Sequence, residues 1–164
     1  MIELTSVLVA VDFSEASKNA IVYGRNLARA FDAELHVLHV ADVISTSAAQ
    51  FYPEGPGDPE AKAMELATTQ LRSLLAAEHA ADARVAVRVA PDPADAIVQY
   101  GRETHAGLIV LGTHGRTGVS RFFMGSVAEH VVRRADAPVL VVRPAERLRE
   151  SARARNEFED CAAS

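Results

Sequence analysis

Near the start of the chain stands the sequence Val7-Leu8-Val9-Ala10-Val11-Asp12-Phe13-Ser14, whose first five residues are all apolar. Since no polar residue alternates with them, a strand at this position is expected to have both of its faces covered. Strands of this kind occupy the centre of a largely parallel sheet that carries helices on both sides. We therefore expect a central strand over Leu4 to Val11 in a domain of the α/β class.

Beyond this strand, short aliphatic runs alternate with amphipathic stretches, which is the pattern of an α/β domain. Further strands are expected at residues 34–41, 84–90, 108–111 and 139–142. Helices are expected at residues 14–31, 60–80, 92–104 and 126–135. In the third strand, Val85, Val87 and Val89 alternate with residues that include Arg88, which favours the edge of the sheet. Asp92-Pro93 is typical of a helix start, with Asp as the N-cap and Pro at the first helical position.

Length and charge narrow the classes of function. The 164 residues correspond to about one domain. There are 17 basic and 22 acidic residues, so the chain lacks the basic excess with which general nucleic-acid binders displace counterions. Trp is absent and aromatic residues make up 5% of the chain, which argues against a surface on which bases stack. We therefore expect neither DNA nor RNA as a partner.

The cellular compartment is inferred from cysteine content and hydropathy. Cys161 is the single cysteine, which excludes an internal disulfide and a zinc site built from cysteines, and this favours a reducing compartment. The longest aliphatic run, Val7 to Val11, is far too short to span a membrane, and Glu3 stands where a signal peptide would carry basic residues. The sequence thus predicts a cytoplasmic protein with no membrane partner.

Two segments depart from the alternating pattern. Residues 42–59 are interrupted by proline and glycine, which exclude both helix and strand, and a connection of this length is typically a lid or disordered. Residues 145–164 are highly charged and contain few large apolar side chains. We expect one folded domain over residues 1–144 and a charged C-terminal tail over residues 145–164.

The carboxyl ends of the strands are the expected place for a ligand, because open parallel sheets bind ligands where the strand order reverses. A glycine-rich segment follows the fourth strand; it contains Gly112 and Gly115 and leads to Gly125-Ser126 at the start of a helix. Glycines let a backbone approach a ligand closely, and the N–H groups at a helix start bind anions such as phosphate. The alternative is that Ser126 only caps its helix, with Glu129 completing a capping box.

Asp12 follows the central strand and has two possible roles. Its carboxylate can accept hydrogen bonds from sugar hydroxyls, whereas Asp12 or Ser14 can instead cap the first helix. The histidines are weaker candidates. His36 and His39 lie three residues apart on a strand, so their side chains point to opposite faces and cannot share a metal ion. His114, in the glycine-rich segment, either approaches a phosphate or is an exposed loop residue.

The spacing Gly112-x2-Gly115-x9-Gly125-Ser126 resembles the nucleotide-binding signature of the universal stress protein family. Val7 to Ser14 is similar to the family's opening strand with its aspartate, Leu38-His39-Val40 to its second strand end, and Ala137 to Val142 to its closing strand. The resemblance covers residues 1 to about 144. It implies an open five-stranded parallel sheet in the order 3-2-1-4-5 with helices on both faces, a Rossmann-like fold of the adenine nucleotide α-hydrolase-like type.

The resemblance also implies that the chain binds ATP, with Mg²⁺ held by the phosphates. Carried over position by position, it places Asp12 on the ribose and the backbone of Val40 on the adenine. The residues that it places at the nucleotide are Ala10, Val11, Asp12, Val40, Leu111, Gly112, Gly115, Arg116, Gly125, Ser126 and Val127. It further implies a homodimer through antiparallel pairing of the strand Val139 to Val142, an apolar edge that must otherwise be blunted.

Three functions remain open at this point. The first is a cytoplasmic, homodimeric ATP-binding protein of stress response or signalling, in which the nucleotide changes the 42–59 segment or the dimer surface. The second is a slow ATP hydrolase or self-phosphorylating protein; the chain offers no evident base beside the phosphates and no HExxH, GxSxG or P-loop motif. The third is a dimeric interaction module that binds no nucleotide, and the intact glycines argue against it.

Overall fold

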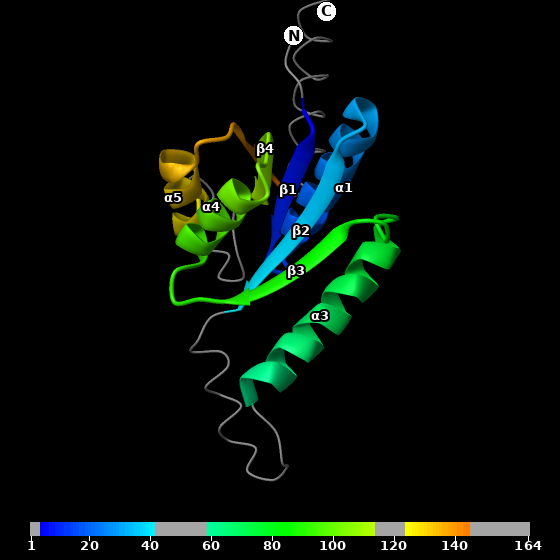
Figure 1. Ribbon diagram of the computed structural model, residues 1–164, viewed down its shortest axis with the longest axis vertical. Helices are drawn as coiled ribbons and strands as arrows, with labels where there is room; N and C mark the ends of the chain where they lie inside the picture. The colour runs from blue at the N-terminus through cyan, green and yellow to red at the C-terminus, as the bar shows by residue number, and fades with distance from the viewer. Residues whose placement is uncertain (1–3, 42–58, 114–123, 145–164) are drawn as a thin grey trace, which may run out of the picture.

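The computed structural model describes residues 4–41, 59–113 and 124–144, and these residues form a five-stranded parallel sheet flanked by helices (Figure 1). The strands are β1 (Ser6–Val11), β2 (Glu34–Ala41), β3 (Arg84–Val89), β4 (Leu108–Gly112) and β5 (Val139–Val142). The helices are α1 (Glu15–Phe31), α3 (Pro59–Ala77), α4 (Pro93–Glu103) and α5 (Ser126–Arg134). The strand order is β3-β2-β1-β4-β5, so the predicted fold class and topology are confirmed.

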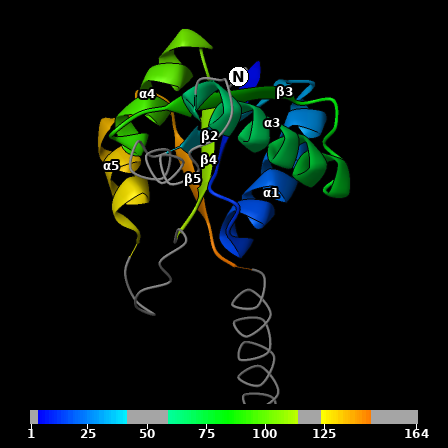
Figure 2. The same ribbon diagram turned by 90° about the horizontal axis from the view of Figure 1, so that it is seen from below.

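Helices cover both faces of the sheet. Figure 2 shows α1 and α3 on one side of the strands and α4 and α5 on the other. The alternate residues of β1 supply both cores: Val7 and Val9 pack with Ile21 and Leu71, whereas Leu8 packs with residues of α4 and α5. All six residues of β1 are buried. The unbroken apolar run of this strand is therefore explained by its central position, as the sequence predicts.

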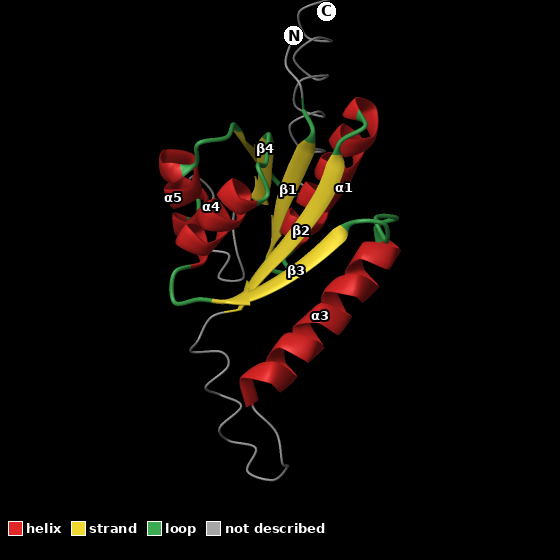
Figure 3. Ribbon diagram, viewed as in Figure 1, coloured by secondary structure: helices red, strands yellow, loops and turns green. Residues whose placement is uncertain are grey.

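Figure 3 shows the helices and strands of the described residues. Their boundaries agree with expectation to within a few residues. The first strand begins at Ser6 rather than Leu4, and the helix expected to end near Ala80 ends at Ala77. Asp92 caps α4 as predicted, since one carboxylate oxygen accepts hydrogen bonds from two backbone N–H groups of the first turn. β3 lies at an edge of the sheet and carries Arg88, which is also in accord with the prediction.

Helix α1 packs against β1 through a glycine, Gly24, which leaves no room for a side chain. A Cβ atom built on Gly24 would lie 2.3 Å from Cγ2 of Val9, a distance at which something must shift. Val9 is fully buried. The absence of a side chain at residue 24 thus sets how closely α1 approaches the centre of the sheet.

Several expectations concern residues outside the described ranges. They are the 42–58 part of the predicted irregular connection, the segment with His114, Gly115 and Arg116, and the charged tail at 145–164. Among the described helices, none is both long and apolar enough to cross a membrane.

Candidate functional site

A cavity of about 230 Å³ lies at the carboxyl ends of β1, β2 and β4, beside the first turns of α4 and α5. At this place the strand order β3-β2-β1-β4-β5 reverses, because β2 lies on one side of β1 and β4 lies on the other. Its described lining residues are Ala10, Val11, Asp12, Leu38, Val40, Pro93, Ile97, Leu111, Gly112, Thr113, Gly125, Ser126, Val127 and Ala128.

The cavity brings together most of the residues that the sequence singles out. Nine of the eleven predicted nucleotide contacts line it, and the other two, Gly115 and Arg116, lie outside the described residues. Sequence reasoning missed five lining residues, which are Leu38, Pro93, Ile97, Thr113 and Ala128. Pro93 was within reach of prediction, because the helix start at Asp92 follows the carboxyl end of a strand of the same sheet. Ile97 lies one turn further along that helix.

Asp12 lies in a tight turn that joins β1 to α1. Its Oδ1 atom accepts hydrogen bonds from the backbone N–H of Ser14 at 3.1 Å and from the Ser14 hydroxyl at 2.6 Å. Ser14, not Asp12, is the N-cap of α1, since its Oγ accepts a hydrogen bond from the N–H of Ser17. The sequence left open whether Asp12 caps the helix or faces a ligand. In the structure Ser14 caps the helix and Asp12 lines the cavity.

Phe13, between those two residues, contributes to the turn through its backbone conformation and through its ring. Its φ of 66° places it in the left-handed region, which is uncommon for a bulky residue. Its ring lies against the ring of His39, with centroids 4.5 Å apart. Nδ1 of His39 is 2.7 Å from the carbonyl oxygen of Val11, so the same histidine also contacts the end of β1.

Gly112, at the end of β4, packs directly against the first turn of α1. A Cβ atom at this position would lie 2.7 Å from the Cβ of Ala16 and 3.0 Å from its carbonyl carbon. Because the second of these neighbours is backbone, it has little freedom to move aside. The glycine therefore lets the end of β4 reach the cavity between Asp12 and α5.

The start of α5, which borders the cavity, carries backbone N–H groups that have no partner within the helix. Gly125 is its N-cap, makes no side-chain capping bond, and has φ −61° and ψ 151°. The first N–H to bond within the helix is that of Glu129, which donates to the carbonyl of Gly125 at 2.9 Å. The preceding N–H groups, those of Ser126, Val127 and Ala128, have no helical partner. An anion in the cavity would therefore meet N–H donors at the positive end of a helix dipole.

The capping-box alternative for Ser126 is wrong. Ser126 is the first residue of α5 rather than its N-cap, and the carboxylate of Glu129 pairs with Arg133 at 2.9 Å. The helix start is instead held from outside the helix: the N–H of Gly125 donates to the carbonyl of Thr113 at 2.7 Å, and the N–H of Thr113 donates to Val142 at 2.8 Å.

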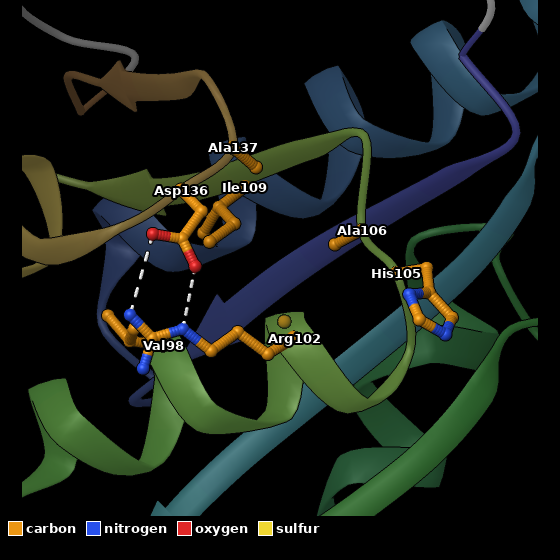
Figure 4. Close-up of a pocket in the computed structure, with 8 residues that line it drawn as sticks. Val98, Arg102, His105, Ala106, Ile109, Asp136 and Ala137 are labelled. Carbon is orange, nitrogen blue, oxygen red and sulfur yellow. Dashed lines mark hydrogen bonds and ion pairs between the residues drawn. The ribbon is translucent and has the colours of Figure 1, made fainter.

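A second cavity, of about 290 Å³, lies near the other end of the sheet, where β4 and β5 begin (Figure 4). Its floor includes Ile109, and its charged side chains bind each other, since Nε of Arg102 is 2.7 Å from Oδ2 of Asp136. This hydrogen bond lowers the pKa of Asp136 below its ordinary value. Both side chains are exposed. Because its opposite charges already satisfy each other, this cavity is the less suitable of the two for an anionic ligand.

The side chains of the two histidines of β2, His36 and His39, lie on opposite faces of the sheet, as predicted. His36 lies 3.2 Å from the hydroxyl of Tyr100 and 2.9 Å from a carboxylate oxygen of Glu34, on the side of α4. His39 contacts Phe13 and Val11, which belong to the core on the side of α1 and α3. Within the described residues, no group of three potential ligand side chains is placed to hold a metal ion.

Comparison with known proteins identifies the family. Residues 3–143 match the model of the Universal stress protein family. The chain belongs to the universal stress protein family. Universal stress protein MJ0531 of Methanocaldococcus jannaschii is 32% identical over 150 residues, which cover 84% of this chain and 81% of that protein.

Solved universal stress proteins share the fold described above. One, solved in complex with cAMP, is 24% identical with a TM-score of 0.61, over 87% of this chain and 99% of its own. Another, from Archaeoglobus fulgidus in complex with dAMP, is 24% identical with a TM-score of 0.56, over 87% of this chain and 99% of its own. At this identity the likeness establishes the fold alone.

Proposed function

We propose that this universal stress protein binds an adenine nucleotide, ATP with Mg²⁺ held by its phosphates, and acts as a homodimer in stress response or signalling in the cytoplasm. The observation that carries the proposal is the cavity at the strand ends. It joins an apolar slot on β1, β2 and β4, a carboxylate at Asp12, and the first N–H groups of α5, which have no partner within the helix. Such a combination suits an aromatic base, a sugar and a phosphate respectively.

The polarity of the cavity supports this orientation. Among its described lining residues, Asp12 alone carries a charge, and it lies at the end of β1. Ser126 and Val127 stand at the start of α5, where the helix dipole favours anions. A phosphate is therefore best placed at α5 and the sugar hydroxyls at Asp12, which leaves the base to the slot near Val40. The cAMP and dAMP complexes of proteins with the same fold agree with an adenine nucleotide as the ligand class.

The first experiment identifies the ligand. The purified protein is denatured, any released nucleotide is identified by mass spectrometry, and the refolded protein is titrated with ATP, with and without Mg²⁺. We expect a bound adenine nucleotide or micromolar affinity for ATP. Absence of both, in protein shown by circular dichroism to be refolded, would favour the interaction module that binds no nucleotide.

A substitution at the helix start tests the phosphate assignment. Gly125 has dihedral angles that any residue adopts, so Gly125→Val is expected to preserve the fold while its side chain enters the phosphate region. We expect this variant to lose ATP binding. His130→Val, an exposed position on the same helix, is the matched control and should bind ATP like the parent protein. Unchanged affinity of Gly125→Val would refute the phosphate assignment.

The proposed homodimer rests on the edge of the sheet formed by β5. The carbonyls of Pro138 and Val142 accept hydrogen bonds from backbone N–H groups of Ile109 and Thr113, at the two ends of β4. Because successive residues of a strand turn their backbone N–H and C=O groups to opposite sides, those of Val139 and Val141 face away from β4, towards the edge of the sheet. Helices α1 and α5 flank this strand on its two faces and carry the exposed side chains of Tyr23 (43%) and Val132 (44%). An apolar strand at the edge of the described sheet is suited to pairing with a second copy.

Substitution of Val141 tests the edge. Val141→Pro removes one edge N–H while leaving the bonds to β4 in place, whereas Val141→Thr retains that N–H. By sedimentation velocity at micromolar concentration, we expect a dimer for the parent protein and Val141→Thr and a monomer for Val141→Pro. A monomeric parent protein, or a dimer that survives the proline, contradicts the assignment.

A further inference from the structure

The Asp12 carboxylate is held by one neighbour at one of its two oxygens. The backbone N–H and the hydroxyl of Ser14 both bind Oδ1, at 3.1 and 2.6 Å. Within the described part of the chain, no other residue donates to this carboxylate. Asp12 lines the cavity at the strand ends, so its second oxygen, Oδ2, is the one that remains for a ligand.

Ser14 is itself fixed to helix α1. Its Oγ accepts from the N–H of Ser17 at 3.3 Å, and its carbonyl accepts from the Ser17 hydroxyl at 2.9 Å. Ser17 belongs to the first turn of α1 and is almost completely buried. The first turn of α1 therefore holds Ser14 in place, and Ser14 in turn holds Oδ1 of Asp12.

The backbone of the turn is fixed by a separate contact. Phe13 holds a φ of 66° and its ring lies on that of His39, which contacts the end of β1. These contacts place the Cα of Asp12 but not its carboxylate. Orientation of the carboxylate therefore depends on Ser14, while position depends on Phe13.

We propose that Ser14 is a positioning residue for ribose recognition: by holding Oδ1 of Asp12 it presents Oδ2 to a ribose hydroxyl and gives the site a preference for ribonucleotides. This inference rests on the proposed nucleotide-binding function. A carboxylate already held in its bound rotamer loses less conformational freedom when the ligand arrives. Removal of the Ser14 hydroxyl takes away the shorter of the two hydrogen bonds and leaves Oδ1 of Asp12 with only the 3.1 Å bond from the backbone N–H. The carboxylate is then held less firmly, so the loss in affinity is confined to ligands that carry the hydroxyl.

The test compares three nucleotides on four proteins. ATP, 2′-deoxy-ATP and 3′-deoxy-ATP are titrated calorimetrically into the parent protein and into Ser14→Ala, Ser14→Gly and Ser14→Thr. We expect Ser14→Ala and Ser14→Gly to weaken ATP binding about tenfold, the factor that corresponds to ~1.4 kcal/mol. The analogue that lacks the hydroxyl bound by Asp12 should bind all four proteins within about twofold. Ser14→Thr keeps the donor and should retain the preference of the parent protein.

The two variants that lack the hydroxyl separate positioning from helix capping. Glycine is tolerated at an N-cap almost as well as serine, whereas alanine is not, so Ser14→Gly and Ser14→Ala differ in thermal stability but share the lost donor. Equal changes in nucleotide preference for both variants support the positioning role. A double variant with Asp12→Ala provides the second check, because the Ser14 substitution should have no further effect on preference once the carboxylate is gone.

The failures are distinguishable. If the parent protein binds none of the three nucleotides, the proposed function fails and this inference fails with it. If ATP binds but the Ser14 variants weaken all three nucleotides by the same factor, Ser14 acts only through the stability of α1, and the inference is overturned while the function stands. Unchanged affinity for ATP in Ser14→Gly overturns the inference as well.

Discussion

The contact between Gly24 and Val9 allows a quantitative prediction for Gly24→Ala. Alanine in a helix interior is favoured over glycine by about 1 kcal/mol. The added Cβ would lie 2.3 Å from Cγ2 of Val9, more than 1 Å inside an ordinary contact of about 3.5–4.0 Å, and Val9 has no exposed surface into which to move. Overpacking of this severity costs about 3 kcal/mol, at the upper end of its usual range. We expect Gly24→Ala to lower the free energy of unfolding by about 2 kcal/mol.

A change at Val9 should reverse the sign of this effect. The other neighbours of the added atom, side chains of Leu35 and Val7, lie at 3.7 Å, which is an ordinary contact. In a Val9→Ala background the overlap is removed, so only the helix-propensity gain of about 1 kcal/mol remains and Gly24→Ala becomes stabilising. The coupling energy between the two positions is then about 3 kcal/mol, which is at the upper end of the range for residues in contact.

Urea unfolding of the four proteins measures this coupling. The transitions are followed by circular dichroism at one protein concentration, because association contributes to the apparent stability of a dimer. An effect of Gly24→Ala that is the same in both backgrounds would refute the claim that the added methyl group overlaps Val9.

Three further predictions concern a cap and two titrating groups. Asp92→Ala should lower the free energy of unfolding by about 1 kcal/mol and Asp92→Asn should leave it nearly unchanged, as measured by urea unfolding; equal losses would show that capping is not the cause. The hydrogen bond from His36 lowers the pKa of Glu34 below its ordinary 4.5, so the stability from Glu34 is present above that pH and lost as the pH falls through the lowered pKa. Acid titration of Glu34→Gln should show a shallower loss there, and an unchanged profile would contradict the pairing. Burial raises the pKa of Tyr100 above its ordinary 10.0, so its contribution to stability is present below pH 10 and lost as the pH rises towards the raised pKa. Absorbance near 295 nm, compared with Tyr100→Phe, should place its midpoint above that of free tyrosine, and a midpoint at or below it would rule out the effect of burial.

The fold was predictable because the apolar pattern and the burial of the strands agree. The unbroken run at Val7 to Val11 indicated a central strand, and all of β1 is buried. Alternation at Val85 and Val87 indicated an edge strand, and β3 is at the edge. Both patterns report how many faces of a strand are covered, which is a local property that a sequence records directly. The strand order itself came from the resemblance to the family, and the sheet confirms it.

The candidate site was predictable in outline but not in detail. The resemblance to the family placed nine of its lining residues at the nucleotide. Strand ends and glycines, which carry local signals, pointed to the same region of the sheet. Leu38 and Ile97 were missed since each is buried in the core and also borders the cavity, and a sequence pattern shows only the first property. The alternative prediction that Ser126 is the N-cap of α5 was wrong by one position. The N-cap is Gly125, which makes no side-chain hydrogen bond and so leaves no signal in the sequence. The division of roles between Asp12 and Ser14 depends on which oxygen receives which donor, and no pattern specifies that.

The hydrogen bond between Thr113 and Val142 has a consequence for how the protein responds to its own concentration. Thr113 borders the cavity and Val142 ends the edge strand, so one backbone hydrogen bond joins the cavity to the edge of the sheet. If filling the cavity strengthens association at β5 by some factor, thermodynamic reciprocity requires that association strengthen ligand affinity by the same factor. The apparent dissociation constant would then fall as the protein accumulates. A cell that makes more of this chain would thereby obtain a receptor that is also more sensitive.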